Sequence, residues 1–564
     1  MREEKIMKKK IHRYGWLGFV LMISLVLIWP AGATVKVSYL QNQLLPPLPD
    51  PQKNFDSKLD FTLQRLTEIY LTTGLEKTRE FAAQHKIELK GDSVRVVAEA
   101  ETGHLGTLGI GTRVSLISHQ IEAFGGKVET TYEHLIQHLA PIRALPNIAR
   151  LPMISRLRLP FKPIPLVITS EGVSKTGANS WQSIGAYRTQ DNVKVCILDL
   201  GFKGYTDLLG SELPSSVTPR SFRADNDIEA DQVHGAACAE IVHDMAPDAE
   251  LYFVNFNTDV EHHNAVSWIM SQGAKVISYS IGWFNAGDGR GTGPICDDVK
   301  RASDAGIVWC NSAGNAAEDH WEGNFYDPDN DKLMNFSASG ELLQTYGTSC
   351  SAWMNWDDWG TWNGSYYSGS SQDFDLYLYY YEGGIWKLIM KSEGAQTGTQ
   401  EPAEFVGASA NVPLHWALAI RKYKATRNCR MELFTSGSFE AIQYNVPAGS
   451  ITIPADSPYA VTVGATDCMT DAYHTYSSRG PTHDGRIKPD FAAPSGVSTV
   501  SYGMRGFYGT SASAPHMAGA FALISGKTPY SLDQIRSILD GRALDLGSAG
   551  KDNAYGLGRL KLTR

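Results

Sequence analysis

The sequence predicts an α/β protein with a parallel sheet flanked by helices, preceded by a small α+β unit and interrupted by an inserted antiparallel β-sandwich. Three observations predict this architecture. From Val193 onward, strand patterns alternate with helix patterns, as they do where helical crossovers connect parallel strands. Residues 34–175 mix helix and strand patterns in a smaller unit. Residues 336–449 carry short aromatic runs of period two, separated by Gly and Ser turns.

Length, composition and charge narrow the class of protein. The 564 residues exceed what one hydrophobic core usually organises, so several domains are expected. A hydrophobic content of 43% with 20% charged residues is typical of a soluble globular protein. The formal net charge of −9 argues against a nucleic-acid-binding protein, which usually carries a basic face. We therefore expect no nucleic-acid partner.

Residues 1–33 have the pattern of a secretory signal peptide. Basic residues come first, an apolar run over 16–29 follows, and Ala31-Gly32-Ala33 supplies the small residues of a cleavage site. The apolar run is too short to span a membrane comfortably. We therefore expect cleavage after Ala33, secretion to the periplasm or the extracellular space, and no membrane association afterwards.

Residues 34–175 are expected to form a separate α+β unit that ends in a linker. Its predicted elements are a helix over 61–70, a strand over 93–98, a helix over 114–124, a strand over 128–132, a helical turn near 142 and a last strand near 151. Arginines and prolines then crowd residues 150–165, where the prolines exclude a continuous helix. This stretch is interpreted as the linker, and a processing site and a solvated loop fit it equally well.

The parallel-sheet domain is expected in two parts, residues 176–335 and 450–564. Its first part alternates strands over 193–198, 249–256, 275–281 and 306–311 with helices over 234–244, 260–271 and 296–305, and its second part resumes with a strand over 460–465. Sites in such folds lie at the carboxyl ends of the strands. Asp199, Ser280 and Asn315 all fall at or just beyond strand ends.

The insert over residues 336–449 is predicted to be all β. Its alternating runs cover 353–362, 375–380, 386–390, 415–421 and 430–434. The chain has seven cysteines, so at least one thiol stays unpaired. Cys196 and Cys238 are interpreted as small core residues, and Cys350 and Cys429 are the candidate disulfide.

Three residues offer an acid, a base and a nucleophile in chain order. Asp199 ends a buried strand, where a carboxylate needs a partner such as an imidazole N–H. His234 begins a helix, and its imidazole can accept a serine proton and return it. Ser511 opens an apolar helix, where its hydroxyl and its own N–H are available. Asn315 offers a side-chain amide to a developing oxyanion.

Each of these residues also has an ordinary explanation. Alone, Asp199 fits a strand-end turn, His234 a surface side chain and Ser511 a helix N-cap. The remaining histidines, including His262 and His263, are interpreted in this ordinary way. The order Asp, His, Ser excludes the α/β-hydrolase order and the chymotrypsin order. The combination therefore favours nucleophilic catalysis of acyl transfer.

Six motifs make the chain resemble the subtilases, the subtilisin-like serine endopeptidases, from about Val193 to the C-terminus apart from the insert. They are Asp199-Leu200-Gly201, His234-Gly235, Ser312-Ala313-Gly314-Asn315, Ser478-Arg479-Gly480-Pro481, Lys488-Pro489-Asp490 with Ala493-Pro494, and the run from Gly509 to His516. The resemblance implies a subtilisin-like fold and a secreted endopeptidase that hydrolyses peptide bonds through an acyl-enzyme. Such an enzyme requires no cofactor.

The resemblance also assigns roles. It implies that Asp199, His234 and Ser511 are the triad and that Asn315 is the oxyanion donor. Substrate would bind along Ser280, Ile281 and Gly282, and Ala313 and Gly314 would form the opposite wall of the pocket. Residues 34–175 would be a propeptide that acts as an intramolecular inhibitor of a self-processing zymogen, with cleavage expected between 160 and 185. Protein or peptide substrates are the expected partners.

The chain departs from the family pattern at three positions. Ala236 and Ala512 are small apolar changes that should preserve the chemistry. Trp283 stands where the family usually has glycine, and its indole could narrow the cleft or redirect the substrate, so the resemblance does not fix the cleavage preference.

One loop is a candidate metal site. Asp327, Asp329 and Asp331 place carboxylates at alternate positions, a pattern that suits a structural Ca²⁺. The glycine and the final glutamate of an EF-hand are missing, so a solvated acidic turn is the favoured interpretation.

Two other functions fit parts of the sequence. The aromatic insert could bind a polysaccharide or a protein while the rest serves as scaffold, although Trp and Tyr also fill sandwich cores. A scaffold would need none of the four catalytic-type residues. An esterase or peptide ligase would use the same acyl-enzyme and would differ only in the acceptor.

Overall fold

The computed structural model describes residues 58–85, 87–102, 109–161, 164–165, 172–184, 193–230, 232–338 and 340–563. The expected signal peptide and the peptide bond after Ala33 lie outside the described residues. Every described residue falls within the compact unit Asn42–Arg564. None of the helices in the described ranges combines the length and apolarity needed to cross a membrane.

The α+β unit consists of helices packed on a five-stranded antiparallel sheet. Its strands are β1 (Leu89–Lys90), β2 (Ser93–Ala100), β3 (Lys127–Tyr132), β4 (Leu135–Pro141) and β5 (Ile154–Arg158), and its helices are α2 (Phe61–Thr73), α3 (Leu75–Gln84), α4 (Ile110–Ala123), the 3-10 turn η1 (Ile142–Ala144) and α5 (Leu145–Ala149). Strand β2 pairs with β1, β4 and β5. Strand β5 lies inside residues 150–165, so part of the predicted linker is regular structure.

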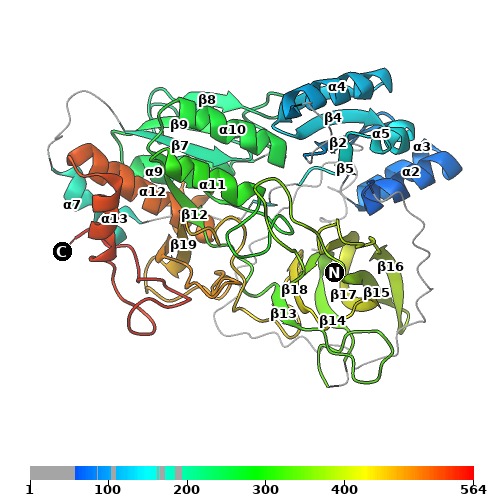
Figure 1. The fold of residues 1–564 in the computed structure, drawn as a ribbon. Helices are drawn as coiled ribbons and strands as arrows, with labels where there is room; N and C mark the ends of the chain where they lie inside the picture. The colour runs from blue at the N-terminus through cyan, green and yellow to red at the C-terminus, as the bar shows by residue number, and fades with distance from the viewer. Residues whose placement is uncertain are drawn as a thin grey trace, which may run out of the picture. The chain divides into compact units, whose positions relative to one another are not determined.

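The central sheet has seven parallel strands in the order β20-β19-β12-β10-β7-β9-β8. Figure 1 labels β8, β9, β7, β12 and β19 of this sheet. They are β7 (Lys194–Asp199), β8 (Thr218–Ser221), β9 (Glu250–Asn255), β10 (Val276–Tyr279), β12 (Val308–Ser312), β19 (Ala460–Asp467) and β20 (Phe491–Ser495). The parallel pairing of all neighbours confirms the predicted fold class.

Helices cover both faces of this sheet. Successive side chains of each strand point to opposite faces, and both sets are buried against these helices. Val195 and Ile197 of β7 point into one core with α9 (His234–Met245), α12 (Thr510–Lys527) and α13 (Leu532–Asp540). Cys196 and Leu198 point into the other core with α10 (Asp259–Ser271) and α11 (Pro294–Asp304). A strand that is buried on both faces reads as a continuous apolar run, which is how β7 appears in the sequence.

The insert is antiparallel, as predicted, and its six strands form one sheet in the order β13-β18-β14-β17-β15-β16. They are β13 (His320–Asn324), β14 (Leu343–Trp356), β15 (Asp373–Glu382), β16 (Ile385–Ser392), β17 (Ala403–Lys424) and β18 (Arg430–Ser436). The long strands β14 and β17 pair on both sides of an irregularity near Gly347. Strand β13 pairs with β18, so the sheet begins before the predicted boundary at residue 336.

The predicted disulfide is wrong. No disulfide joins Cys350 and Cys429 or any other pair of the seven cysteines, all of which are buried. Both belong to the apolar core of the insert, where cysteine packs as a small hydrophobic residue.

Candidate active site

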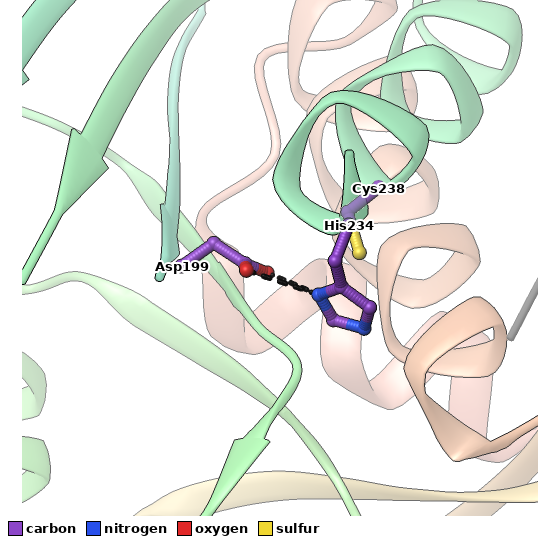
Figure 2. A group of neighbouring side chains, drawn as sticks. All are labelled: Asp199, His234 and Cys238. Atoms are coloured by element: carbon purple, nitrogen blue, oxygen red, sulfur yellow. Dashed lines mark hydrogen bonds and ion pairs between the residues drawn. The ribbon is translucent and has the colours of Figure 1, made fainter. Parts of the chain in front are cut away.

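The acid and the base meet at the carboxyl end of the central sheet. Asp199 is the last residue of β7 and His234 is the first residue of α9. His234 Nδ1 lies 2.8 Å from Asp199 Oδ2 and 3.0 Å from Oδ1, and both side chains are fully buried (Figure 2). An ionised carboxylate can only accept, so the Nδ1–H of His234 donates to it. This fixes the tautomer in which Nε2 can accept a proton.

The nucleophile candidate sits at the start of α12. Ser511 is the second residue of this helix, after Gly509, whose φ of 121° is open to glycine but strained for other residues. Its Oγ lies 3.4 Å from the carbonyl oxygen of Ser280. Near the start of a helix the backbone N–H of Ser511 has no intrahelical acceptor, so it is available to an incoming negative charge.

Pro515 explains a second contact of Ser511. Proline has no N–H, so the carbonyl of Ser511, four residues earlier, loses its normal helical donor. The hydroxyl of Ser280 donates to this carbonyl at 3.0 Å, and the Cys238 thiol does so at 3.6 Å. The side chains of Ser280 and Cys238 therefore replace the missing helical hydrogen bond.

The oxyanion-donor candidate is held from the other side. Asn315 Oδ1 accepts from the N–H of Thr510 at 2.9 Å and from its hydroxyl at 3.0 Å. The Thr510 hydroxyl in turn accepts from the N–H of Gly314 at 3.1 Å. With Oδ1 occupied in this way, the Nδ2 group of Asn315 is directed away from Thr510 and can donate elsewhere.

The predicted substrate strand is already paired with another segment of the chain. Strand β11 (Ile281–Gly282) pairs antiparallel with β6 (Ile164–Pro165) in the register Ile281 with Pro165 and Gly282 with Ile164. The two strands form a separate two-stranded sheet in which Ile281 and Gly282 are buried, and pairing with an extended segment is a common mode of peptide binding. The segment that occupies it comes from upstream of the parallel-sheet domain.

The opposite wall, predicted at Ala313 and Gly314, is tightly packed. Ala313 is fully buried, and its N–H donates to Val463 at 2.9 Å. Gly314 has a φ of 111°, and a Cβ there would lie 2.6 Å from the Ser478 hydroxyl and 2.7 Å from Thr452. A side chain at this position would therefore displace the wall.

Comparison with known proteins identifies the family. The model of the subtilase family matches residues 190–356 and 392–558, more than half of the chain. The chain belongs to the subtilase family. The sequence resemblance and the predicted subtilisin-like fold are thereby confirmed.

Individual relatives match shorter stretches of this subtilase. The extracellular serine protease of Serratia marcescens is 26% identical over 204 residues, which are 32% of this chain and 19% of that protein. Subtilisin Savinase of Lederbergia lenta is 40% identical over 119 residues, 20% of this chain and 40% of that protein. The matches thus cover less than half of either relative. The CspB protease structure of Clostridium perfringens has a TM-score of 0.48 and 14% identity, covering 69% of this chain and 97% of that chain.

In this subtilase, Trp283 does not narrow the cleft, which is one of the two effects that the sequence leaves open. Its side chain is 1% exposed, and its Nε1–H donates to the Tyr279 hydroxyl at 2.7 Å. The indole stacks on Phe256, with ring centroids 6.0 Å apart, in the core between the sheet and helices α10 and α11. Its bulk therefore fills the interior.

His262 and His263 are buried, so the interpretation as surface residues is wrong. Their side chains are almost fully buried, and the Nδ1 atoms of both point at Oδ2 of Asp298, that of His262 at 2.8 Å. Burial alone would raise the pKa of Asp298, but the two imidazoles outweigh it and hold that pKa far below its usual range. The available signal was helical spacing, because His262 lies four and seven residues before the buried Val266 and Ile269.

Cys238 lies beside the acid–base pair, one helical turn after His234 (Figure 2). One potential ligand atom each of Asp199, His234 and Cys238 lies within 4.8 Å of the others. Burial raises the pKa of the Cys238 thiol well above its usual range, so the thiol stays protonated. It therefore acts as the weak donor to the Ser511 carbonyl described above, in keeping with its predicted place in the core.

The three aspartates of the acidic loop also lie close to one another. One carboxylate oxygen each of Asp327, Asp329 and Asp331 lies within 4.8 Å of the others, between strands β13 and β14.

Proposed function

We propose that this subtilase is a secreted serine endopeptidase, made as a zymogen that processes itself, with Asp199, His234 and Ser511 as its triad. The observation that carries the proposal is the 2.8 Å hydrogen bond from His234 Nδ1 to Asp199, at the sheet edge where Ser511 opens α12. This bond orients the imidazole as a general base, which a scaffold protein would not need.

The reaction follows from these positions. Ser511 Oγ attacks the peptide carbonyl carbon while its proton moves to His234 Nε2. The tetrahedral oxyanion accepts hydrogen bonds from the Ser511 N–H and from Asn315 Nδ2. His234 then gives the proton to the leaving amine, the C–N bond breaks and an acyl ester remains on Ser511. Water attacks this ester with His234 again as the base, which releases the acid and restores the serine.

The substrate is proposed to lie as an extended strand along Ser280, Ile281 and Gly282, facing the wall at Ala313 and Gly314. The pairing of β6 with β11 supports this, since it shows that the backbone of the segment accepts an antiparallel neighbour. A protein or peptide in extended conformation is the matching substrate.

The α+β unit is proposed to be the propeptide and the intramolecular inhibitor. It contacts the first turn of α10 through a buried ion pair, in which Arg158 Nη2 lies 2.6 Å from Asp259 Oδ2. Gln137 donates to Glu261 at 3.0 Å, and Tyr132 stacks on His263 at a centroid distance of 4.6 Å. The same unit is followed by β6, which occupies the substrate strand, so binding of the unit and obstruction of the site are coupled.

Export is proposed from the signal-peptide pattern of residues 1–33. The names of two relatives support it, the extracellular serine protease of Serratia marcescens and the minor extracellular protease Vpr of Bacillus subtilis.

The test compares the full chain with its Ser511→Ala variant. We expect the parent to shorten by the N-terminal unit, to react with a serine-directed phosphonate and to hydrolyse a denatured protein substrate. Ser511→Ala should do none of these. Ser525→Ala, a change of the same size on the same helix, is the matched control and should behave like the parent. A folded parent that stays uncut and unlabelled would contradict the proposal.

A further inference from the structure

The loop that leads into the insert gathers three carboxylates at one point. Asp327, Asp329 and Asp331 lie between β13 and β14, and one oxygen of each lies within 4.8 Å of the others. Calcium binds oxygen at about 2.4 Å, so two oxygens on opposite sides of one ion are about 4.8 Å apart. The three carboxylates are thus close enough to share a single ion.

One of these carboxylates is buried with an unsatisfied oxygen. The Asp327 side chain is only 4% exposed, and its Oδ1 is buried without a hydrogen-bond partner among the described residues. Its Oδ2 accepts the N–H of Lys332 at 3.2 Å. A buried carboxylate oxygen without a donor or a cation is costly. Asp329 and Asp331, when ionised, cannot donate, so they increase the cost by repulsion.

The surrounding charges leave the cluster negative. Burial, followed by the charges of Asp331, Asp329 and Asp327, raises the pKa of Glu341, so a fourth carboxyl group feels the same field. Lys422 brings one positive charge, but its Nζ is 3.7 Å from Asp327 Oδ2, beyond hydrogen-bond distance. The same ammonium lies 5.0 Å from the centroid of the Phe325 ring. A single loosely placed ammonium does not balance three carboxylates.

The backbone of the loop turns sharply at two residues. Asn330 and Lys332 have φ values of 62° and 77°, in the left-handed region. Asp331 Oδ1 accepts the N–H of Leu333 at 2.8 Å, which holds this part of the turn. Two residues that flank the loop, Phe325 and Met334, are buried in the core of the insert. The position of the loop is therefore tied to the packing of the insert.

We propose that Asp327, Asp329 and Asp331 bind one Ca²⁺ ion at the point where the chain runs into the insert. Oxygen-only ligands select a hard cation, whereas zinc sites use histidine and cysteine. Calcium accepts irregular geometry and completes its shell with backbone oxygens and water, which an exposed loop can supply, whereas magnesium demands a regular octahedron. A cation bound at Asp327 would also offset the cost of its buried carboxylate, whose Oδ1 has no hydrogen-bond partner among the described residues. The sequence alone favours a solvated acidic turn, and the experiment below distinguishes the two interpretations.

The site is tested in the full chain carrying Ser511→Ala, so that self-cleavage cannot change the sample. After treatment with a chelator and its removal, Ca²⁺ is titrated by calorimetry and Tb³⁺ by luminescence. Tyr326, next to Asp327 and 54% exposed, serves as the sensitiser for Tb³⁺. We expect sensitised luminescence that Ca²⁺ displaces. We also expect Ca²⁺ to raise the thermal unfolding midpoint.

The decisive variant is Asp329→Asn, because Asp329 is exposed and its amide is nearly isosteric, so the fold should be preserved. We expect it to bind one Ca²⁺ fewer, or to bind that ion at least about tenfold more weakly, since affinity follows ligand charge. Asp207→Asn makes the same charge change at an exposed aspartate of α8 (Tyr205–Leu208) and is the matched control, with unchanged binding.

Three results would overturn the proposal. The first is equal Ca²⁺ stoichiometry and affinity for the parent and Asp329→Asn. The second is the absence of Ca²⁺-displaceable Tb³⁺ luminescence in the parent, a measurement that needs no variant at this loop. The third is equal binding of Mg²⁺, which would contradict the assignment to calcium. Because the chain under test is inactive, none of these results depends on the proposed protease activity.

Discussion

The hydroxyl of Ser280 donates a hydrogen bond of 3.0 Å to the backbone carbonyl of Ser511. The two residues come from the end of a strand and the start of a helix, 231 positions apart. This bond replaces the helical donor that Pro515 cannot supply, so the residue that precedes the proposed substrate strand β11 also supports the first turn of α12, which carries the proposed nucleophile.

Ser280→Ala should therefore destabilise the protein. The Ser511 carbonyl would be left with the weak Cys238 donor, and a poorly satisfied buried acceptor costs about 1–3 kcal/mol in the free energy of unfolding. Chemical denaturation in the Ser511→Ala background measures this. Ser278→Ala is the matched control, because the Ser278 hydroxyl is buried without a hydrogen-bond partner among the described residues. Equal losses for the two variants would contradict the assigned role.

Asn315→Ala should lower kcat and leave KM almost unchanged, because the oxyanion forms only in the transition state. The expected loss is about 10²–10³-fold, the magnitude measured for the oxyanion-hole asparagine of subtilisin itself. Thr510→Val, which removes the hydroxyl that donates to Asn315 Oδ1, should cause a smaller loss. Steady-state kinetics on a peptide substrate decides this, and an unchanged kcat for Asn315→Ala would exclude the role.

The register of β6 and β11 predicts where self-processing occurs. Pro165, the last residue of β6, pairs with Ile281, and the next residue toward the site, Ser280, has its carbonyl oxygen 3.4 Å from Ser511 Oγ. We expect the processed chain to begin within a residue or two of Val167, inside the range 160–185 expected from the sequence. N-terminal sequencing of the processed protein checks this, and a start beyond residue 175 would contradict the register.

Asp259→Asn should weaken the binding of the proposed propeptide to the parallel-sheet domain. It leaves Arg158, which is 4% exposed, with one carboxylate partner fewer, and breaking a buried ion pair costs about 3–5 kcal/mol. The cut propeptide should then dissociate faster, which would shorten the lag before peptide hydrolysis begins. Glu68→Gln breaks the exposed ion pair with Arg65 and should leave the lag unchanged. A longer lag in Asp259→Asn would contradict the proposed inhibition.

The pair of buried histidines should make stability depend on pH. Burial would lower the pKa of His263, but the Asp298 carboxylate outweighs it and raises that pKa. A histidine whose pKa is raised by folding stabilises the folded protein fully at pH values below its unfolded pKa of about 6.5. This stabilisation is lost as the pH rises through the folded pKa. Burial lowers the pKa of His262, so the titration of His262 affects stability only at lower pH.

Unfolding of the Ser511→Ala chain at pH 6 to 9 measures the effect, with a slope of up to about 1.4 kcal/mol per pH unit. Asp298→Asn should flatten this slope, because it removes the carboxylate that holds the His263 proton. His119→Asn changes an exposed histidine and should leave the slope as it is. A slope that persists in Asp298→Asn would have to come from other groups.

The sequence allowed the central sheet and the proposed catalytic residues to be predicted because both depend on local patterns. Strand β7 is a continuous apolar run that ends at Asp199, and α12 is an apolar helix opened by glycine and serine. The contacts of His262 and His263 with Asp298 could not be predicted, since they depend on how α10 packs against α11. The orientation of the Trp283 side chain could not be predicted either, because it depends on how the indole packs in the core and not on the local sequence.

The insert also means that the parts of the proposed site are synthesised at different times. Asp199, His234 and Asn315 precede it in the chain, and Ser511 follows it, so the nucleophile helix is synthesised after the whole six-stranded sheet. Domains generally fold as units in the order in which they are made. A chain that has been synthesised only up to residue 449 still lacks Ser511, so under the proposed mechanism a partly made chain is inactive.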